Sequence, residues 1–286
     1  MGKGLKWMEK LVRGAVDYAL PPRCPSCGVM VEADDRFCLP CWSKLDFLGP
    51  PWCARCQMPL DDAALEGDWC AACLAQEPPY DRVSAVVAYT PQSGALVLKL
   101  KYGRRTGLAR LIATHMLRHV PQDSDEGEGG GEWLLVPVPL HPMRLWERGF
   151  NQSLLIARHL GKRTGFTVMP DLLRRTKRTR PLKGLNPAQR DKEVRAVFAL
   201  APDGKAHVKG RRILLVDDVF TSGATARACA RKLKQAGAAE VRIFCWARVV
   251  PRRAALDLGL PDSDMPEDKE RGWRASKTLR NENAQG

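Results

Sequence analysis

The cysteines constrain the fold of this chain more than any other feature. Eight of its ten cysteines fall between residues 24 and 73, in four pairs that each have two residues between the partners. Such a gap lets both thiolates of a pair turn toward one ion, and two pairs complete the tetrahedron of a structural zinc site. The pattern therefore predicts two zinc sites in a small double zinc ribbon over residues 23–78. The expected ligands are Cys24, Cys27, Cys38, Cys41, Cys53, Cys56, Cys70 and Cys73.

The way in which the four pairs combine is open from the sequence. Pairing neighbours gives two successive sites, and an interleaved pairing serves zinc equally well. A disulfide framework fits less well, because it needs an oxidising compartment, and paired knuckles at ribbon spacing are more typical of zinc than of iron–sulfur clusters. Since the ligand set has no histidine and no open position, we expect both zinc ions to be structural.

Three tryptophans in the ribbon allow two interpretations. Trp42, Trp52 and Trp69 could stack on nucleic-acid bases, but a tryptophan beside a zinc knuckle more often packs a small core. Cys229 and Cys245 lie outside the ribbon, in a helical and a strand pattern, and we expect them to be ordinary small core residues.

The amino terminus indicates an amphipathic helix rather than an export signal. Apolar residues of the segment 1–22 recur at helical spacing and are interrupted by charges, whereas a secretory signal needs an unbroken apolar stretch of about 7 to 15 residues. No run in the chain approaches the roughly 20 apolar residues that span a bilayer. We therefore expect a cytoplasmic protein with no membrane span.

The formal net charge of +14 suggests an anionic partner. The chain stays strongly basic when eight zinc-bound thiolates are counted. Phosphate-bearing ligands and nucleic acid both fit this balance, and so does a merely solvated basic surface.

From about residue 80 to 250 the pattern predicts an α/β domain. Strands are expected at 83–89, 133–140, 195–200, 212–219 and 241–249, and helices at 105–119, 151–165 and 223–236. This alternation is typical of βαβ units, so we expect a mostly parallel sheet flanked by helices on both faces. Residues 121–132 indicate a surface loop and residues 251–286 a disordered tail.

The stretch "ILLVDDVFTSGAT" suggests a ligand site. Its buried strand leads into Asp217 and Asp218, and ligands of open α/β sheets bind at the carboxyl ends of strands. The backbone N–H groups of the tight loop that follows, at the first turn of a helix, can hold a phosphate. The two acids can accept hydrogen bonds from vicinal hydroxyls, so the pair of features predicts a ribose 5-phosphate ligand. The expected phosphate-loop residues are Thr221, Ser222, Gly223, Ala224 and Thr225.

This stretch resembles the phosphoribosyl pyrophosphate (PRPP) motif of type I phosphoribosyltransferases. No Gly-Lys-Ser/Thr follows, so it is not a Walker A motif. Further stretches, "LVLKLKYGRR" (96–105), "LLVPVPLHPMRLWERGFNQSLLIA" (134–157) and "LLRRTKRTRPLKGLNPAQRDKEVRAVFAL" (172–200), stand in the order expected of the ComF family. With the cysteine knuckles, the resemblance covers roughly residues 5 to 250.

The resemblance to the ComF family implies a zinc ribbon joined to a type I phosphoribosyltransferase-like domain, and an association with natural competence. It implies PRPP binding with Mg²⁺ and, in an enzyme, loss of pyrophosphate from C1 of the ribose. Arg144 and Arg148 follow the strand at 133–138 and are the expected pyrophosphate contacts, unless they face solvent or pair with Glu147. Lys99 and Lys101 are further candidates, or lie on the solvated face of a helix.

Two function classes remain open from the sequence. One is a phosphoribosyltransferase that acts on an unidentified base or amine. The other is a non-catalytic competence factor that binds single-stranded DNA and competence proteins and uses the fold as a scaffold. Residues 174–195 hold nine Lys or Arg against two acids, which suits a lid over pyrophosphate or a track for nucleic acid. In this segment Leu182 and Glu193 replace a Gln and an Asn usual in the family, which leaves turnover open.

Overall fold

The structure is a computed structural model that describes residues 21–121, 133–176 and 197–250. The helix expected over 1–22 lies almost wholly outside these residues, and so do the tail at 251–286, nearly all of the loop at 121–132, and Leu182 and Glu193 in the basic segment. Within the described residues, no helix has the length and apolarity that a membrane crossing requires.

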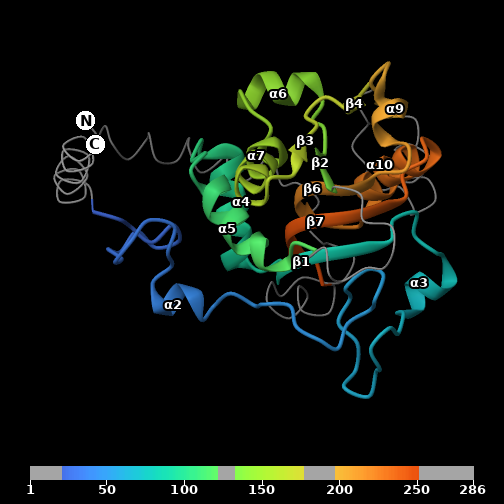
Figure 1. The fold of residues 1–286 in the computed structure, drawn as a ribbon. Coiled ribbons are helices and arrows are strands. Elements are labelled where there is room, and N and C mark those ends of the chain that lie inside the picture. The colour runs from blue at the N-terminus through green and yellow to red at the C-terminus, as the bar shows by residue number, and fades with distance from the viewer. Residues whose placement is uncertain (1–20, 122–132, 177–196, 251–286) are drawn as a thin grey trace, which may run out of the picture.

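The core of the molecule is a sheet of five parallel strands (Figure 1) in the order β1-β7-β6-β2-β3. Strands β6 and β7 lie in its interior and have the longest pairing, from Arg212 opposite Glu240 to Phe220 opposite Arg248. The strands are β1 (Arg82–Ala88), β2 (Trp133–Pro137), β3 (Thr167–Val168), β6 (Arg212–Phe220) and β7 (Glu240–Arg248).

Helices cover both faces of this sheet, as the alternation of patterns predicts. Helices α4, α5 and α7 lie on one face, and α10 lies on the other (Figure 1). Within the described residues, the domain has the helices α4 (Pro91–Tyr102), α5 (Leu108–Met116), the 3-10 turn η1 (Leu117–His119), α6 (Pro142–Arg148), α7 (Gln152–Thr164), α9 (Gly204–Val208) and α10 (Ala224–Gln235).

Strand β6 has an unbroken apolar run because helices cover it on both faces. Ile213 and Leu215 pack against α10, whereas Leu214 and Val216 pack against α5 and α7. Successive side chains of a strand point to opposite faces, so a sheet with both faces covered needs apolar residues at every position. The continuous run ends where the two carboxylates begin.

The strand expected at 195–200 belongs to a different sheet. Strand β5 (Phe198–Leu200) pairs antiparallel with β4 (Leu173–Arg175), and the two form a separate two-stranded sheet. Because Phe198 and Leu173 are both buried in the core on the α10 side, the segment reads as a buried strand although it is no part of the parallel sheet.

The ribbon segment covers the edge strand β1. The N–H of Leu48 donates to Val86 O at 3.1 Å, and the N–H of Val83 donates to Arg55 O at 2.9 Å. The buried Gln57 side chain bonds both backbone groups of Ala85, donating to its carbonyl and accepting from its N–H. An exposed sheet edge invites pairing with other chains, and here the ribbon occupies it. Its helices are α2 (Leu39–Trp42) and α3 (Ala71–Ala75).

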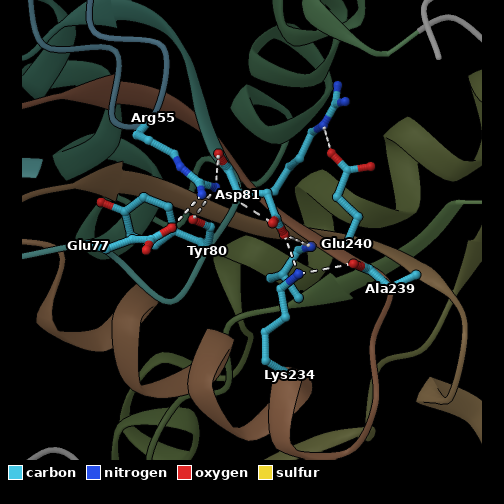
Figure 2. Close-up of polar contacts among 9 residues, drawn as sticks. Arg55, Glu77, Tyr80, Asp81, Lys234, Ala239 and Glu240 are labelled. Atoms are coloured by element: carbon cyan, nitrogen blue, oxygen red, sulfur yellow. Dashed lines mark hydrogen bonds and ion pairs between the residues drawn. The ribbon is translucent and has the colours of Figure 1, made fainter. Parts of the chain in front are cut away.

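A polar cluster fastens the start of β1 to β7 and α10 (Figure 2). Asp81 accepts from the N–H of Val241 at 2.7 Å, and its carboxylate lies 2.6 Å from Lys234 Nζ. Arg55 reaches into the same cluster from the ribbon and lies 2.6 Å from Glu77. The ribbon, the connection into β1 and helix α10 therefore meet at one place.

Candidate functional site

The sheet reverses its direction of growth between β2 and β6. From β2 the chain continues outward to β3, whereas from β6 it continues in the opposite direction to β7. In open parallel sheets the crevice outside the carboxyl ends of two such strands is the usual ligand site. The predicted site residues belong to segments that begin at these two strand ends.

Asp217 and Asp218 lie within β6, not at its very end. Strand β2 stops at Pro137, opposite Val216, while β6 continues to Phe220 because β7 still pairs with it. The two acids are therefore the first residues of β6 that β2 no longer covers. The expectation of a strand end is correct for the β2 side and wrong for the β7 side.

Each acid has a polar contact from a neighbouring helix. Ser153 Oγ, on α7, donates to Asp217 Oδ1 at 3.0 Å, and the Asp218 N–H donates to the same oxygen at 2.9 Å. Lys101 Nζ, on α4, lies 3.1 Å from Asp218 Oδ2, and both side chains are largely buried, at 15% and 4% exposed.

Burial and the neighbouring Asp218 disfavour the charge on Asp217. Burial raises the pKa of Asp217 to about 7, the adjacent Asp218 adds to the rise, and Lys101 opposes it. A carboxylate beside a second acid, with little water around it, is disfavoured in its charged form, and a ligand that donates a hydrogen bond to it relieves part of that cost. Strongly shifted carboxyl groups in a crevice are typical of functional sites.

The predicted phosphate loop leads into the start of helix α10, where the backbone N–H groups of the first turn point toward the loop. Thr221 and Ser222 are exposed, and α10 begins at Ala224. Its N-cap is Gly223, with φ +74, and no acidic side chain occupies the first turn. A left-handed N-cap at a 12-residue helix leaves the first N–H groups and the positive end of the helix dipole for an anion.

Gly223 also lies too close to Phe220 for any other residue. A Cβ at this position would stand 2.6 Å from Phe220 Cζ. The loop thus rests directly on the ring of the last residue of β6, which is 5% exposed.

The predicted pyrophosphate contacts have partners of their own. Arg148 is buried, donates to Gln152 Oε1 and Tyr102 Oη, both at 3.2 Å, and stacks on the Tyr102 ring at 5.0 Å. It neither faces solvent nor pairs with Glu147. Arg144 is half-buried on α6. A role of either arginine in binding pyrophosphate stays a prediction.

The structure separates the two lysines of α4. Lys99 Nζ donates to the carbonyls of Pro25 and Ser26, at 2.9 and 2.6 Å. These two residues lie between Cys24 and Cys27, in the first of the two zinc ribbons. Lys101 instead contacts the acidic pair, so neither lysine lies on a solvated helix face. Ser153 and Tyr102 are further neighbours of the site that no sequence pattern singled out; only their place in the stretches 134–157 and 96–105 pointed toward them.

The eight ribbon cysteines form two clusters from successive pairs. One holds Cys24, Cys27, Cys38 and Cys41 and the other holds Cys53, Cys56, Cys70 and Cys73, with the sulfurs of each cluster within 4.8 Å of one another. Four thiolates at this spacing fit a tetrahedral zinc ion. The successive pairing is the one the structure has, and each cluster is a closed site suited to structural zinc.

All three tryptophans of the ribbon, Trp42, Trp52 and Trp69, are half-buried and pack against the core clusters. Trp42 lies among Phe37, Phe47 and His115, with ring centroids 4.7 to 6.2 Å away. Trp69 lies under the Arg55 guanidinium at 4.7 Å. Cys229 and Cys245 are fully buried core residues, as expected.

Family models match the two parts of the chain separately. The double zinc ribbon domain matches residues 15–76, and the phosphoribosyl transferase domain matches residues 162–257. Two Cys₄ clusters joined to a helix-flanked parallel sheet therefore define a zinc-ribbon protein with a phosphoribosyltransferase-like fold.

Curated relatives narrow this class to a family. The chain is 31% identical over 198 residues to the DNA utilization protein YhgH of Salmonella typhi, covering 69% of this chain and 84% of that protein. It is 27% identical over 227 residues to Competence protein F of Haemophilus influenzae, covering 79% and 96%. Competence protein ComFC of Bacillus subtilis is 34% identical over 121 residues, covering 41% and 45%. The chain belongs to the ComF family.

Among solved structures, the chain is similar to the allosteric regulatory enzyme of purine biosynthesis. The identity is 21% and the TM-score 0.32, over 52% of this chain and 29% of that one. A likeness of this size carries no argument about the site.

Proposed function

We propose that the site beyond the carboxyl end of β2, beside Asp217 and Asp218 of β6, binds PRPP, and that the chain acts as a phosphoribosyltransferase on an unidentified base or amine. The observation that carries the proposal is the acidic pair, Asp217 and Asp218, directly before a phosphate loop at the start of α10. The pair accepts hydrogen bonds from the ribose 2′ and 3′ hydroxyls. The loop Thr221–Thr225 holds the 5-phosphate through backbone N–H groups and hydroxyls.

The chemistry asked of such a site is mainly positioning and charge stabilisation. When pyrophosphate leaves C1, the ribose carbon gains positive character, and an acceptor base or amine forms the new bond at that carbon. A fixed pair of carboxylates near the ribose favours this charge, because preorganised groups cost no reorganisation during the reaction. Contacts with both the 5-phosphate and the pyrophosphate hold C1 in a fixed orientation toward the acceptor, which lowers the barrier further.

Magnesium fits this proposal as a partner of the substrate. Carboxylate and phosphate oxygens are its preferred ligands; Asp217 would supply the first kind and the pyrophosphate of PRPP the second. Bound Mg²⁺ would neutralise charge on the leaving group.

The relatives extend the proposal to DNA. Their names refer to competence and DNA utilization, and the net charge of +14 suits a polyanion. We propose that the protein acts in the handling of incoming single-stranded DNA, in the cytoplasm, where reduced cysteines can hold zinc. Competence proteins are the expected protein partners.

Calorimetric titration with PRPP and Mg²⁺ tests the ribose-phosphate site. We expect saturable binding by the wild type and loss of binding in the Asp217→Asn/Asp218→Asn double variant. Arg242→Met, at the opposite end of the sheet, is the matched control and should bind as the wild type does. A folded wild type that binds no PRPP would sink the transferase proposal.

The second candidate function is single-stranded DNA binding on a non-catalytic scaffold, and the basic charge is what favours it. Its signature is an affinity for single-stranded DNA that falls linearly with salt on a logarithmic scale. Base-dependent release of pyrophosphate would instead support turnover. DNA binding that persists unchanged in the double Asp variant, without any PRPP binding, would make this candidate the leading one.

A further inference from the structure

Arg248 is a buried arginine to which the proposed mechanism gives no role. It is the last residue of β7 and is 4% exposed. One guanidinium nitrogen donates to the backbone carbonyl of Cys56, and the other lies 3.6 Å from Cys56 Sγ. Arg248 is thus held by a ligand residue of the second cysteine cluster.

The same guanidinium stacks on the residue that supports the phosphate loop. Arg248 Cζ lies 5.0 Å from the centroid of the Phe220 ring. The Phe220 ring in turn lies against Gly223, where a Cβ would be 2.6 Å away. Tyr80 forms a T-shaped contact with the same ring, with centroids 6.0 Å apart.

These contacts form one continuous chain from a zinc ligand to the loop. Cys56, Arg248, Phe220 and Gly223 touch in that order, and all four residues are buried. A close-packed interior passes on a displacement of one member to the next. Zinc fixes the Cys56 knuckle, the Cys56 carbonyl fixes the guanidinium, and the guanidinium fixes the ring on which Gly223 rests.

The electrostatics of Arg248 favour the zinc-bound state of the cluster. The Arg248 guanidinium lies 3.6 Å from Cys56 Sγ, a ligand atom of the second cluster. A cation beside a buried thiolate stabilises the form that binds metal. Arg248 therefore has a favourable contact with each of its neighbours in the path, Cys56 and Phe220.

We propose that Arg248 is a positioning residue that couples the second zinc site to the phosphate loop, so that zinc at that site strengthens the binding of a ribose 5-phosphate group. This inference rests on the proposed function, because it assigns a support to the same loop. Coupling of two binding sites is reciprocal, so a 5-phosphate ligand in turn holds the second zinc more firmly.

The test compares ligands for the two ends of the site, with the full zinc-loaded chain. Calorimetry measures the affinity of ribose 5-phosphate and of inorganic pyrophosphate for the wild type and for Arg248→Met. We expect about tenfold weaker binding of ribose 5-phosphate, equivalent to about 1.4 kcal/mol, and pyrophosphate affinity within about twofold of the wild type. A general loss of structure would weaken both ligands alike.

Arg242→Met is the matched control, as a second buried arginine of β7. Arg242 is 7% exposed and stacks on Trp133 at 4.9 Å, at the end of the sheet away from the loop. We expect it to change neither affinity. If Arg248→Met does not fold, Arg248→Lys replaces it, because lysine keeps the charge but lacks the planar fork that reaches Cys56 and covers Phe220 at once.

The reciprocal test follows zinc release to a coloured chelator. Saturating ribose 5-phosphate should slow the release of one of the two zinc ions several-fold in the wild type and leave both rates unchanged in Arg248→Met. Equal ribose 5-phosphate affinities in the two proteins, or an equal loss for both ligands, would overturn the coupling alone. No ribose 5-phosphate binding by the wild type would overturn the proposed function as well, so the two failures are distinguishable.

Discussion

At the scale of single residues, the site rests on positions where one side chain or one hydrogen decides the outcome. Gly223 combines φ +74 with a ring 2.6 Å from the place of a Cβ. Asp217 combines burial with an adjacent acid. Both features lower the stability of the folded chain, and residues that do so are often found at functional sites.

Gly223→Ala should destabilise the protein by more than backbone strain alone would. We expect a loss of about 2–4 kcal/mol in the free energy of unfolding, because left-handed strain adds to overpacking against Phe220. Gly165→Ala is the matched control, since Gly165 has φ +80 and nothing within 4 Å of a Cβ; its cost should be about 1 kcal/mol. Urea unfolding measures both, and equal costs would contradict the close contact.

Asp217→Asn should change the pH dependence of stability. The folded-state pKa of Asp217 is raised from 3.8 to about 7, so the unfolded chain gives up this proton first as pH rises. The wild type should therefore lose stability between about pH 4 and pH 7, on the order of 1–3 kcal/mol, and the Asn variant should not. The difference between their urea midpoints at pH 5 and pH 8 measures this. A constant difference would contradict the raised pKa.

At the scale of elements, the ribbon is fixed to the sheet by a few specific contacts. Gln57 follows the Cys56 knuckle with φ +57 and uses its amide in place of a strand pairing to Ala85. On the other side of the sheet, helix α5 receives the first ribbon through His115, whose ring lies among those of Phe37, Trp42 and Trp246.

Gln57→Ala should loosen the second ribbon from β1. The change leaves the N–H and carbonyl of Ala85 without their partners in a buried place, which costs about 1–3 kcal/mol. Gln76→Ala, at an exposed position of the same ribbon, should cost less than about 0.5 kcal/mol. Hydrogen exchange at the Ala85 amide reports the contact directly, and unchanged protection there would argue against it.

His115 should make the docking of the first ribbon sensitive to acid. Burial, followed by the charge of Arg118, lowers its pKa from 6.5 to about 4. Because the unfolded chain takes up this proton first, stability should fall as pH drops below about 6.5, by about 1–2 kcal/mol at pH 5. His115→Phe should remove that part of the slope in urea unfolding at pH 7 and pH 5. An identical slope in both proteins would contradict a buried neutral histidine.

Local chemistry explains which elements could be predicted from the sequence. The cysteine spacing and the two-sided apolar run of β6 each state a local requirement, so the ribbon and the central strands are predictable. The pairing of β5 with β4 and the contact of Lys101 with Asp218 join residues far apart in the sequence. A local sequence pattern does not indicate contacts of this range. For the same reason the partners of Lys99 and Arg148 could not be predicted.

At the scale of the whole molecule, the two cysteine clusters differ in how far they are buried in the core of the α/β domain. Cys53, Cys56 and Cys73 belong to the same buried core as α10 and β7, whereas Cys27 is exposed. The second zinc site is therefore part of the structure that carries the ligand site.

Loss of the second zinc site should destabilise the sheet more than loss of the first. We expect Cys56→Ser to lower the free energy of unfolding by about 2–4 kcal/mol more than Cys27→Ser, because it opens the shared core. Far-ultraviolet circular dichroism in urea follows the sheet, and zinc content per chain confirms that each variant loses one ion. Equal losses would show that the two ribbons support the sheet alike.

Phosphorus NMR of PRPP with Mg²⁺ tests the phosphate loop directly, because the 5-phosphate and the pyrophosphate give separate resonances. We expect the wild type to shift or broaden both sets, and Gly223→Ala to abolish the effect on the 5-phosphate first. Unchanged 5-phosphate resonances at saturating wild-type protein would contradict a phosphate loop at Thr221–Thr225, and with it the assignment of a PRPP site beside Asp217 and Asp218.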